Sequence, residues 1–311
     1  MPEEEYTWLR NTDILTLEEI ATVVDAFCQV GVRKVRLTGG EPLLRPGIVE
    51  LVDRLSHNPR IDDLAMTTNG TRLSRWSTAL KEAGMNRITI SLDSLKPARF
   101  EMLTRRTCLD KVLEGIREAA ACGFADVKIN TVVMRDFNED ELADLITFGR
   151  EIGAEIRFIE YMDVGGATQW SPQRVFPRAE ILKSIESTLG DIEPVGARGA
   201  APAERFRLQD GTVFGIIAST TEPFCGSCDR SRLTADGLWY HCLYAQEGID
   251  LREMVRDGGA TDDLSATIRR MWQGRVDRGA EERLAEPLRD VLYQVEELKL
   301  DPHREMHTRG G

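Results

Sequence analysis

Histidine is scarce in this sequence, and three common ligand-binding motifs are missing from it. The four histidines, His57, His241, His303 and His307, leave little material for acid-base or metal chemistry based on imidazole, and no H-E-x-x-H pair occurs. There is no G-x-x-x-x-G-K-[ST] run, so a bound nucleotide is not held by a P-loop. No G-x-G-x-x-G opens a helix after a strand, which excludes the usual dinucleotide-binding turn.

Long apolar runs and blocks of like charge are absent as well. No stretch approaches the ~18 uncharged apolar residues of a membrane span, and the first ten residues carry three glutamates, so we expect no secretion signal and a cytoplasmic location. The net charge is −12 and the pI is near 5.0, which favours neither nucleic acid nor an anionic membrane as partner. An anionic ligand would need a local basic pocket.

Short β-branched runs alternate with amphipathic helices over the first two thirds of the 311 residues. The helix expected at 17–30 begins after a capping box formed by Thr16 and Glu19, and Gly31 follows it. Such alternation predicts a parallel sheet with right-handed crossovers. We expect strands at 32–38, 64–69, 87–93, 127–133 and 155–161.

These strands carry apolar residues at one parity and polar residues at the other. Ile88 and Ile90 alternate with Thr89 and Ser91, and the strands at 32–38 and 127–133 show the same pattern. A parallel strand buried on both faces would be hydrophobic almost throughout. We therefore expect the apolar set to face the helices and the polar set to line the lumen of a partly open barrel. An ordinary barrel with a few wet interior positions is the alternative.

The order of the elements predicts an α/β fold built on an incomplete (β/α)6 TIM-like barrel. The chain opens with a loop, a helix and then a strand, so we expect the barrel to lack its first strand. Beyond residue 162, glycine and proline become frequent, and Asp210-Gly211 and Asp236-Gly237 predict two β-hairpins. We divide the chain into a barrel core, 1–162, and a smaller C-terminal domain of hairpins and helices, 163–311.

Three of the six cysteines lie close together in the sequence. Cys225, Cys228 and Cys242 form a C-x2-C-x13-C pattern that can grip one metal centre from a tight turn and a returning strand. A zinc site would need a fourth ligand, which His241 could supply only by turning away from the side of the strand that Cys242 uses. Chemistry alone leaves zinc and a three-cysteine iron-sulfur cluster both open.

Polar residues gather at the ends of the expected strands and beside the cysteines. Arg230 and Arg232 alternate directly after Cys228, and guanidinium groups suit phosphate oxygens, although such a pair can also be a solvated face. The segment 38–42, Thr-Gly-Gly-Glu-Pro, ends the first expected strand, where glycines let the backbone approach a ligand. The segments 67–70, 91–93 and 128–130 end the strands that follow, and this convergence favours a ligand site at the rim.

Together these motifs resemble the GTP 3',8-cyclases of molybdenum cofactor biosynthesis (MoaA), a family of radical S-adenosylmethionine (SAM) enzymes. The resemblance covers the whole chain, and its last motif is the most specific. It is carried, in this order, by KVRLTGGEPLLRPG, MTTNGTRL, ITISLDSL, VKINTVVM, IRFIEYMDVG and FCGSCDRSRLTADGLWYHCL.

The resemblance implies a radical-forming lyase that converts GTP to (8S)-3',8-cyclo-7,8-dihydroguanosine 5'-triphosphate. In the family, an N-terminal [4Fe-4S] cluster on a C-x3-C-x2-C loop cleaves SAM, and a second [4Fe-4S] cluster lies in the C-terminal part. The product goes to cyclic pyranopterin monophosphate synthase, and a homodimer is possible.

By position, the resemblance assigns a role to each strand-end residue. SAM contacts would be Gly39, Gly40, Glu41, Ser91, Asn130 and Met162. GTP contacts would be Arg36, Thr67, Lys128, Arg157, Arg230, Ser231 and Arg232. The second cluster would be held by Cys225, Cys228 and Cys242, and the final Gly310-Gly311 would be a functional tail, unless it is only a disordered end.

One departure from the family pattern concerns the start of the chain. The sequence begins just after the position of the third first-cluster cysteine, and Cys28, Cys108 and Cys122 lie on helical segments where none offers a replacement. We therefore expect a functional form with about 30 more N-terminal residues, one βα unit. The 311 residues alone should take up one [4Fe-4S] cluster and form no 5'-deoxyadenosine.

Two alternatives remain at this point. One is a truncated, inactive relative that binds GTP and one cluster without radical chemistry. The other, more remote, is a zinc-stapled barrel for a different phosphorylated ligand.

Overall fold

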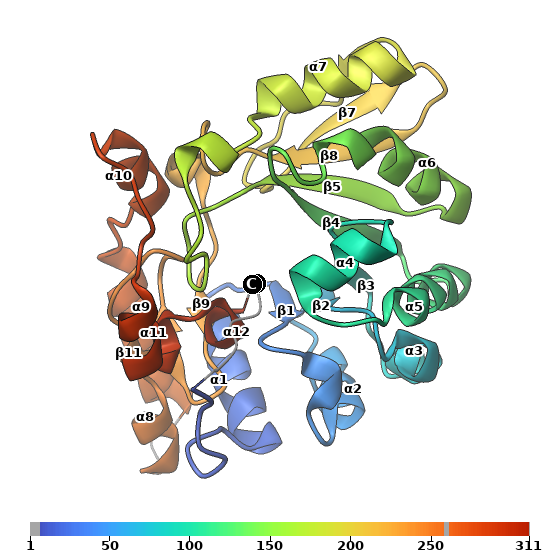
Figure 1. Ribbon diagram of the computed structural model, residues 1–311. Coiled ribbons are helices and arrows are strands. Elements are labelled where there is room, and N and C mark those ends of the chain that lie inside the picture. Colours follow the sequence, from blue (N-terminus) through green and yellow to red (C-terminus); the bar gives the residue numbers. More distant parts are fainter. Residues whose placement is uncertain (1–6, 258–260, 311) are drawn as a thin grey trace.

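The computed structural model describes residues 7–257 and 261–310, and an open eight-stranded sheet curves through it (Figure 1). Six neighbouring strands are parallel, and the last two are antiparallel. In order across the sheet the strands are β1 (Lys34–Leu37), β2 (Asp63–Thr68), β3 (Arg87–Ser91), β4 (Asp126–Val133), β5 (Glu155–Glu160), β8 (Val213–Ile217), β7 (Glu204–Leu208) and β6 (Ile192–Pro194). The predicted α/β architecture is confirmed.

Helices cover the outer side of this sheet (Figure 1). The capping box of Thr16 and Glu19 is present at the start of the first helix, as predicted. The helices of this layer are α1 (Leu17–Gln29), α2 (Ile48–Ser56), α3 (Leu73–Glu82), α4 (Pro97–Thr104), α5 (Leu109–Ala121), α6 (Leu142–Ile152) and α7 (Arg178–Leu189).

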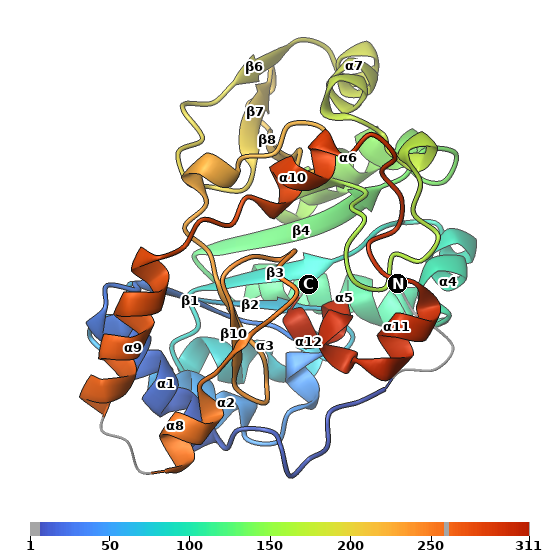
Figure 2. The same ribbon diagram turned by 90° about the vertical axis from the view of Figure 1, so that its left-hand side faces the viewer.

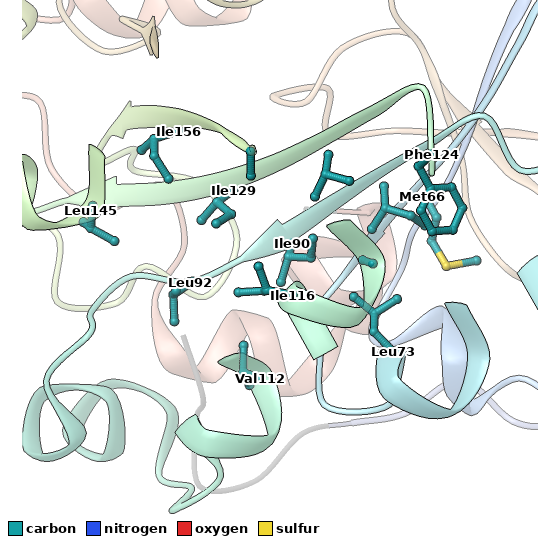
Figure 3. Packing of buried hydrophobic residues seen from close by; sticks show 14 of the residues in the cluster. Met66, Leu73, Ile90, Leu92, Val112, Ile116, Phe124, Ile129, Leu145 and Ile156 are labelled. Atoms are coloured by element: carbon teal, nitrogen blue, oxygen red, sulfur yellow. The ribbon is translucent and has the colours of Figure 1, made fainter. Parts of the chain in front are cut away.

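The apolar parity of the strands faces these helices, as the sequence predicts. Ile88 and Ile90 of β3 are fully buried in the main core, together with Val112 and Ile116 of α5 (Figure 3). Burial of each such side chain stabilises the fold by ~1.5–3 kcal/mol. A strand whose two faces were exchanged would expose several of these side chains at once and would be strongly destabilised. The polar parity is thereby fixed on the inner face of the curve.

The C-terminal part begins inside the same sheet. The Asp210-Gly211 turn joins β7 to β8, and β8 pairs in parallel with β5, so the sheet crosses residue 162. The Asp236-Gly237 turn joins two strands of a separate antiparallel sheet formed by β9 (Arg232–Leu233), β10 (Leu238–Tyr240) and β11 (Ile249–Asp250). Both hairpins are confirmed, whereas the domain boundary after residue 162 stays a prediction.

The small sheet packs against the first helix of the chain. Val23 and Ala26 of α1 form a second apolar cluster with Trp239 of β10 and with Leu264 and Ile268 of α9 (Thr261–Gln273). The helix α8 (Arg252–Arg256) lies on the same side, as Figure 2 shows. The C-terminal part is thus attached to the side of the sheet where β1 lies.

The chain then returns to the centre of the curved sheet. It passes through α10 (Gly279–Ala285), α11 (Val295–Leu300), the turn Pro302–Arg304 and α12 (Met306–Arg309). Both views place its end on the inner face of the sheet (Figures 1 and 2). Within the described ranges, every helix is too short or too polar to span a lipid bilayer.

Candidate functional site

Cations and hydroxyl groups share the inner face of β1, β2 and β3. Nη1 of Arg36 donates hydrogen bonds to Oγ1 of Thr67 (3.0 Å) and to Oγ1 of Thr89 (3.1 Å). Burial, with the nearby charges of Arg87 and Arg157, lowers the pKa of Arg36 to about 10. The pairing of these strands aligns Thr67 with Thr89, which explains why both reach one guanidinium.

The same face continues with cations on β4 and β5. Lys128 is buried and contacts Asp126, and burial together with Arg157 lowers the pKa of the Lys128 ammonium to about 7. Nε of Arg157 donates to Oε1 of Glu155 (2.7 Å), and burial lowers the pKa of Arg157. A partly desolvated row of cations favours an anionic ligand, because a ligand charge would offset both burial and mutual repulsion.

The SAM contacts that the resemblance predicts lie at the strand ends around this row. Ser91 ends β3 opposite Asn130 of β4, and Oδ1 of Asn130 is buried without a hydrogen-bond partner. Gly39 and Gly40 follow β1, with Gly39 at a φ of +126°, and Met162 follows β5. The structure therefore gathers these predicted residues on one rim.

Glu41, also predicted as a SAM contact, has both carboxylate oxygens engaged within the protein. Oε1 accepts from the backbone N–H of Leu43 (3.0 Å) and from the hydroxyl of Thr68 (2.8 Å), and Oε2 accepts from the N–H of Asn69 (2.8 Å). The side chain thus caps a turn and ties the end of β1 to the end of β2. These contacts support a role in shaping the rim.

Three cysteines line the side of the site where the small sheet begins. The N–H of Cys228 donates to the carbonyl of Cys225 (3.1 Å), which forms the expected tight turn, and Cys242 follows β10. Burial opposes ionisation of Cys228, but the backbone N–H and charge of Arg230, with Arg275, outweigh it and lower the pKa of the thiol. A thiol held toward the thiolate form is suited to ligate iron.

The surroundings of these cysteines favour a cluster over a single zinc ion. Within residues 7–257 and 261–310, no group of three His, Cys, Asp or Glu side chains lies close enough together to hold one metal ion. The ring of His241 packs against Trp239 (4.3 Å between centroids) and Trp272 (5.8 Å), inside the second apolar cluster. This packing argues against His241 as a fourth zinc ligand, and the three-cysteine cluster stays a prediction.

Arg230 and Arg232 lie beside the cysteines with unused donors. Nε of each is buried without a hydrogen-bond partner, and the Arg230 guanidinium lies over Phe224 (5.0 Å). Arg232 pairs with Tyr240 across β9 and β10 and lies close to Cys228 and Cys242. Burial first, and then Arg230 and Arg309, lower the pKa of Arg232 to about 10. Ser231, predicted with them, lies between the two arginines and is partly buried.

The C-terminal tail, residues 301–310, enters the same site. A Cβ built on Gly310 would lie 2.6 Å from Cγ2 of Thr38, next to Gly39, so this residue lies against the end of β1. Gly310 has a φ of +76°, which favours glycine. Gly311, the other residue of the predicted functional pair, lies outside the described residues.

Sequence reasoning missed a buried ionic network behind Met162. Asp163 is fully buried and accepts hydrogen bonds from Tyr244 (2.9 Å), Arg283 (2.9 Å) and Arg289 (2.8 Å). It joins the end of β5 to the loop after Cys242 and to the segment around α10. The local sequence shows only that an aspartate, Asp163, follows Met162. Its partners could not be predicted, because they are more than 80 residues away in the sequence.

Two families match this chain, each over one part. Residues 4–149 match the Radical SAM superfamily, and residues 154–281 match the Molybdenum Cofactor Synthesis C family. The fold is similar to that of SuiB from Streptococcus suis, with a TM-score of 0.58 at 14% identity over 92% of this chain and 66% of that one.

Curated relatives are similar over most of their length. GTP 3',8-cyclase 1 of Mycobacterium tuberculosis H37Rv is 57% identical over 315 aligned positions, which cover 100% of this chain and 88% of the relative. The GTP 3',8-cyclase of Acidothermus cellulolyticus is 45% identical over 90% of this chain and 80% of the relative. With the strand-end polar residues and the three cysteines in one site, these relationships show that the chain belongs to the GTP 3',8-cyclase family of radical SAM enzymes.

Proposed function

We propose that this protein is a GTP 3',8-cyclase that acts in the first step of molybdenum cofactor biosynthesis. It would convert GTP, with SAM, to (8S)-3',8-cyclo-7,8-dihydroguanosine 5'-triphosphate. The observation that carries the proposal is the row of cations on the inner face, of which Lys128 is buried, together with the three cysteines beside Arg230 and Arg232. The product would pass to cyclic pyranopterin monophosphate synthase.

The chain's own residues would divide the work by position. Arg36, Lys128 and Arg157 would neutralise the triphosphate, because each is partly desolvated on the inner face. Thr67 and Ser231 would contribute hydroxyl groups at either end of this row. A ligand that covered these cations would also exclude water from the lumen, which strengthens every charge interaction inside it.

SAM would lie at the rim formed by the strand ends. Because glycine has no side chain, Gly39 and Gly40 would let SAM come close to the backbone at the end of β1. Ser91 and Asn130 would supply polar contacts, and Met162 would supply an apolar one. The unpartnered Oδ1 of Asn130 supports this placement, since a buried acceptor gains a donor when a ligand binds.

A [4Fe-4S] cluster would be held by Cys225, Cys228 and Cys242. When bound, it would offer one iron without a cysteine ligand to a substrate atom. The lowered pKa of Cys228 supports this assignment, because iron is ligated by the thiolate.

Two measurements test the site. After anaerobic reconstitution, we expect C225A to lose the iron that the unaltered chain takes up, and R230A and R232A to bind GTP more weakly. Unchanged GTP affinity in both arginine variants would place the pocket elsewhere, and zinc uptake without iron would favour the zinc-stapled barrel. Formation of 5'-deoxyadenosine from SAM, measured in a form that carries the C-x3-C-x2-C loop of the family, separates the cyclase from a protein that only binds GTP.

A further inference from the structure

Arg309, in the last turn of the tail, is buried in the interior of the molecule. Only 3% of its surface is exposed, and its guanidinium lies 4.5 Å from the centre of the Tyr240 ring. Nη1 donates to the carbonyls of Leu243 (2.9 Å) and Ala245 (2.6 Å), and Nε donates to the carbonyl of His303. The side chain is therefore held in one position, against the loop that follows Cys242.

One end of this guanidinium has no partner. Nη2 of Arg309 is buried and has no hydrogen-bond partner among the described residues, as is also true of Nε of Arg230 and Nε of Arg232. None of the three arginines belongs to an ion pair within the part of the chain that the structure describes. Other buried arginines differ: Arg283 and Arg289 both pair with Asp163.

The three arginines also lie near one another. Arg232 pairs with Tyr240 across β9 and β10, and the Arg309 guanidinium lies 4.5 Å from the centre of that Tyr240 ring. Arg230 is two residues from Arg232, and the charges of Arg230 and Arg309 both act on Arg232. The thiols of Cys228 and Cys242 offset part of the charge on Arg232 when ionised, but they leave the free donors unpaired. Buried donors without acceptors and neighbouring like charges are both unfavourable, and an anion with several oxygens would relieve both at once. The arrangement therefore points to a missing polyanion.

We propose that Arg309 is a third guanidinium of the phosphate site, and that it contacts the triphosphate of the nucleotide substrate together with Arg230 and Arg232. This inference rests on the proposed function, since it assigns an additional ligand contact to the same site. Because Arg309 belongs to the tail, the phosphate site is complete only when the tail is docked. Nucleotide binding and tail docking then stabilise each other, as two events linked through one side chain must.

The test compares R309Q with R304Q in the anaerobically reconstituted full chain. R304Q is a matched control because this substitution removes the same charge from the same tail. The Arg304 guanidinium, unlike that of Arg309, pairs with a carboxylate, Glu297 (2.8 Å), and lies over Tyr293. GTP, inorganic tripolyphosphate and guanosine serve as probes in equilibrium binding. We expect R309Q to bind GTP and tripolyphosphate about tenfold more weakly, and guanosine as the unaltered chain does. R304Q should bind all three normally.

Two further measurements keep the result interpretable. Cleavage after Glu305 by the protease Glu-C, followed by mass spectrometry, reports whether the tail is docked, and GTP should slow this cleavage in the unaltered chain. R309K keeps the charge without the planar fork, so its affinity for GTP should lie between those of R309Q and the unaltered chain.

Specific outcomes would overturn the proposal. Normal GTP and tripolyphosphate affinity in R309Q, with weakened binding in R230A, would remove Arg309 from the phosphate site but leave the site itself. An equal loss for guanosine would mean that Arg309 acts only on the shape of the pocket. Altered iron content or electron paramagnetic resonance with normal tripolyphosphate binding would assign Arg309 to the cluster. If R230A and R232A also bound GTP normally, the proposed function would fail instead.

Discussion

Met306 lies directly across Gly165: a Cβ built on Gly165 would be 2.7 Å from the backbone nitrogen of Met306 and in closer contact with its side chain. The neighbouring Gly166 meets Glu305 in the same way, at 2.8 Å from Oε2. On the opposite side, Cβ atoms on Gly39 and Gly40 would lie 3.9 Å from the carbonyl oxygen of His307. Two glycine pairs from distant parts of the sequence thus flank the tail.

This relationship predicts that G165A will displace the tail. Gly199 is a matched control, because its φ of +58° is close to the +52° of Gly165 while no atom lies within 4 Å of a Cβ placed there. Both substitutions should cost ~1–2 kcal/mol for the left-handed backbone, measured by urea unfolding. Only G165A should also speed Glu-C cleavage after Glu305. Equal cleavage rates in the two variants would show that Gly165 is needed only for its left-handed backbone conformation, and not to leave room for the tail.

The Asp163 network predicts a large loss of stability in D163N. This substitution keeps the shape of the side chain but leaves Arg283 and Arg289 without their buried counter-charge, which typically costs ~3–5 kcal/mol. D140N is the control, because Asp140 pairs with Lys96 and Arg99 at a half-exposed position where such pairs contribute ~0–1 kcal/mol. Unfolding free energies from urea titration provide the measurement, and similar values for both variants would contradict the prediction.

The same carboxylate gives this stability a pH dependence. Burial opposes its ionisation, but Arg289, Tyr244 and Arg283 outweigh burial, and the pKa of Asp163 lies below its ordinary value. Its contribution is therefore present above the unfolded pKa of about 3.9 and is lost as the pH falls through the lower, folded value. The difference in unfolding free energy between the unaltered chain and D163N should shrink only below about pH 4.

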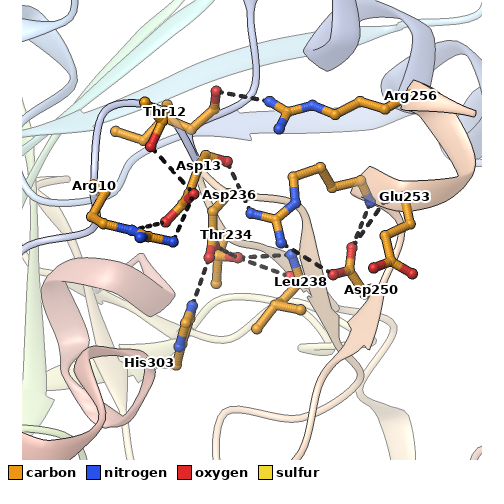
Figure 4. A network of polar contacts seen from close by, with 12 residues as sticks. Arg10, Thr12, Asp13, Thr234, Asp236, Leu238, Asp250, Glu253, Arg256 and His303 are labelled. Atoms are coloured by element: carbon orange, nitrogen blue, oxygen red, sulfur yellow. Dashed lines mark hydrogen bonds and ion pairs between the residues drawn. The ribbon is translucent and has the colours of Figure 1, made fainter.

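His303 should hold the tail more firmly when it is protonated. Its Nε2 lies 2.7 Å from Asp236 (Figure 4), and its Nδ1 lies 3.1 Å from Asp301. The hydrogen bond to Asp236 is the main reason why the pKa of His303 is raised. This stabilisation is complete below the unfolded pKa of about 6.5 and is lost as the pH rises through the higher, folded pKa. The difference in thermal unfolding midpoint between the unaltered chain and H303Q should therefore shrink as the pH rises through the folded pKa of His303. A difference that does not change with pH would show that the neutral imidazole of His303 makes the hydrogen bond to Asp236.

GTP binding should depend on pH through Lys128. Because the pKa of this side chain is lowered to about 7 by burial and by Arg157, binding of an anion must be accompanied by proton uptake above that pH. Affinity for GTP should therefore weaken as the pH rises past 7, whereas K128R, which stays charged, should lose this part of the dependence. Calorimetry in buffers of different ionisation enthalpy measures the proton uptake directly. Identical pH profiles for the two proteins would exclude Lys128 from the contact.

The strands and their faces could be predicted from the sequence because their signal is local. Alternation of Ile88 and Ile90 with Thr89 and Ser91 predicts which face of β3 joins the hydrophobic core, and Ile88 and Ile90 do so, although Thr89 on the inner face is buried as well. The expected strand edges were a little too long: β1 covers Lys34–Leu37, since the glycine-rich turn after Thr38 ends the pairing early. Glu41 follows β1, and its hydrogen bond with Thr68 depends on a neighbouring strand, so the local sequence does not reveal it.

The parts that could not be predicted depend on contacts between distant residues. Nothing near Arg309 in the sequence signals that its guanidinium will meet the carbonyls of Leu243 and Ala245. Asp163 and its arginines carry no periodic pattern either. In the sequence, Gly165 and Gly166 indicate only a loop, although both glycines leave room for the tail.

The tail also sets an order of events during synthesis. Gly39 leaves the ribosome long before Gly310, yet the two end up side by side. Any strands that pair before residue 310 has been made leave the inner face of the sheet without the tail, which can dock only afterwards. Closing so long a loop is slow compared with helix or hairpin formation. Assembly of the phosphate site would thus be a late step of folding, one that a ribosome-stalled chain lacking its final ten residues could not reach.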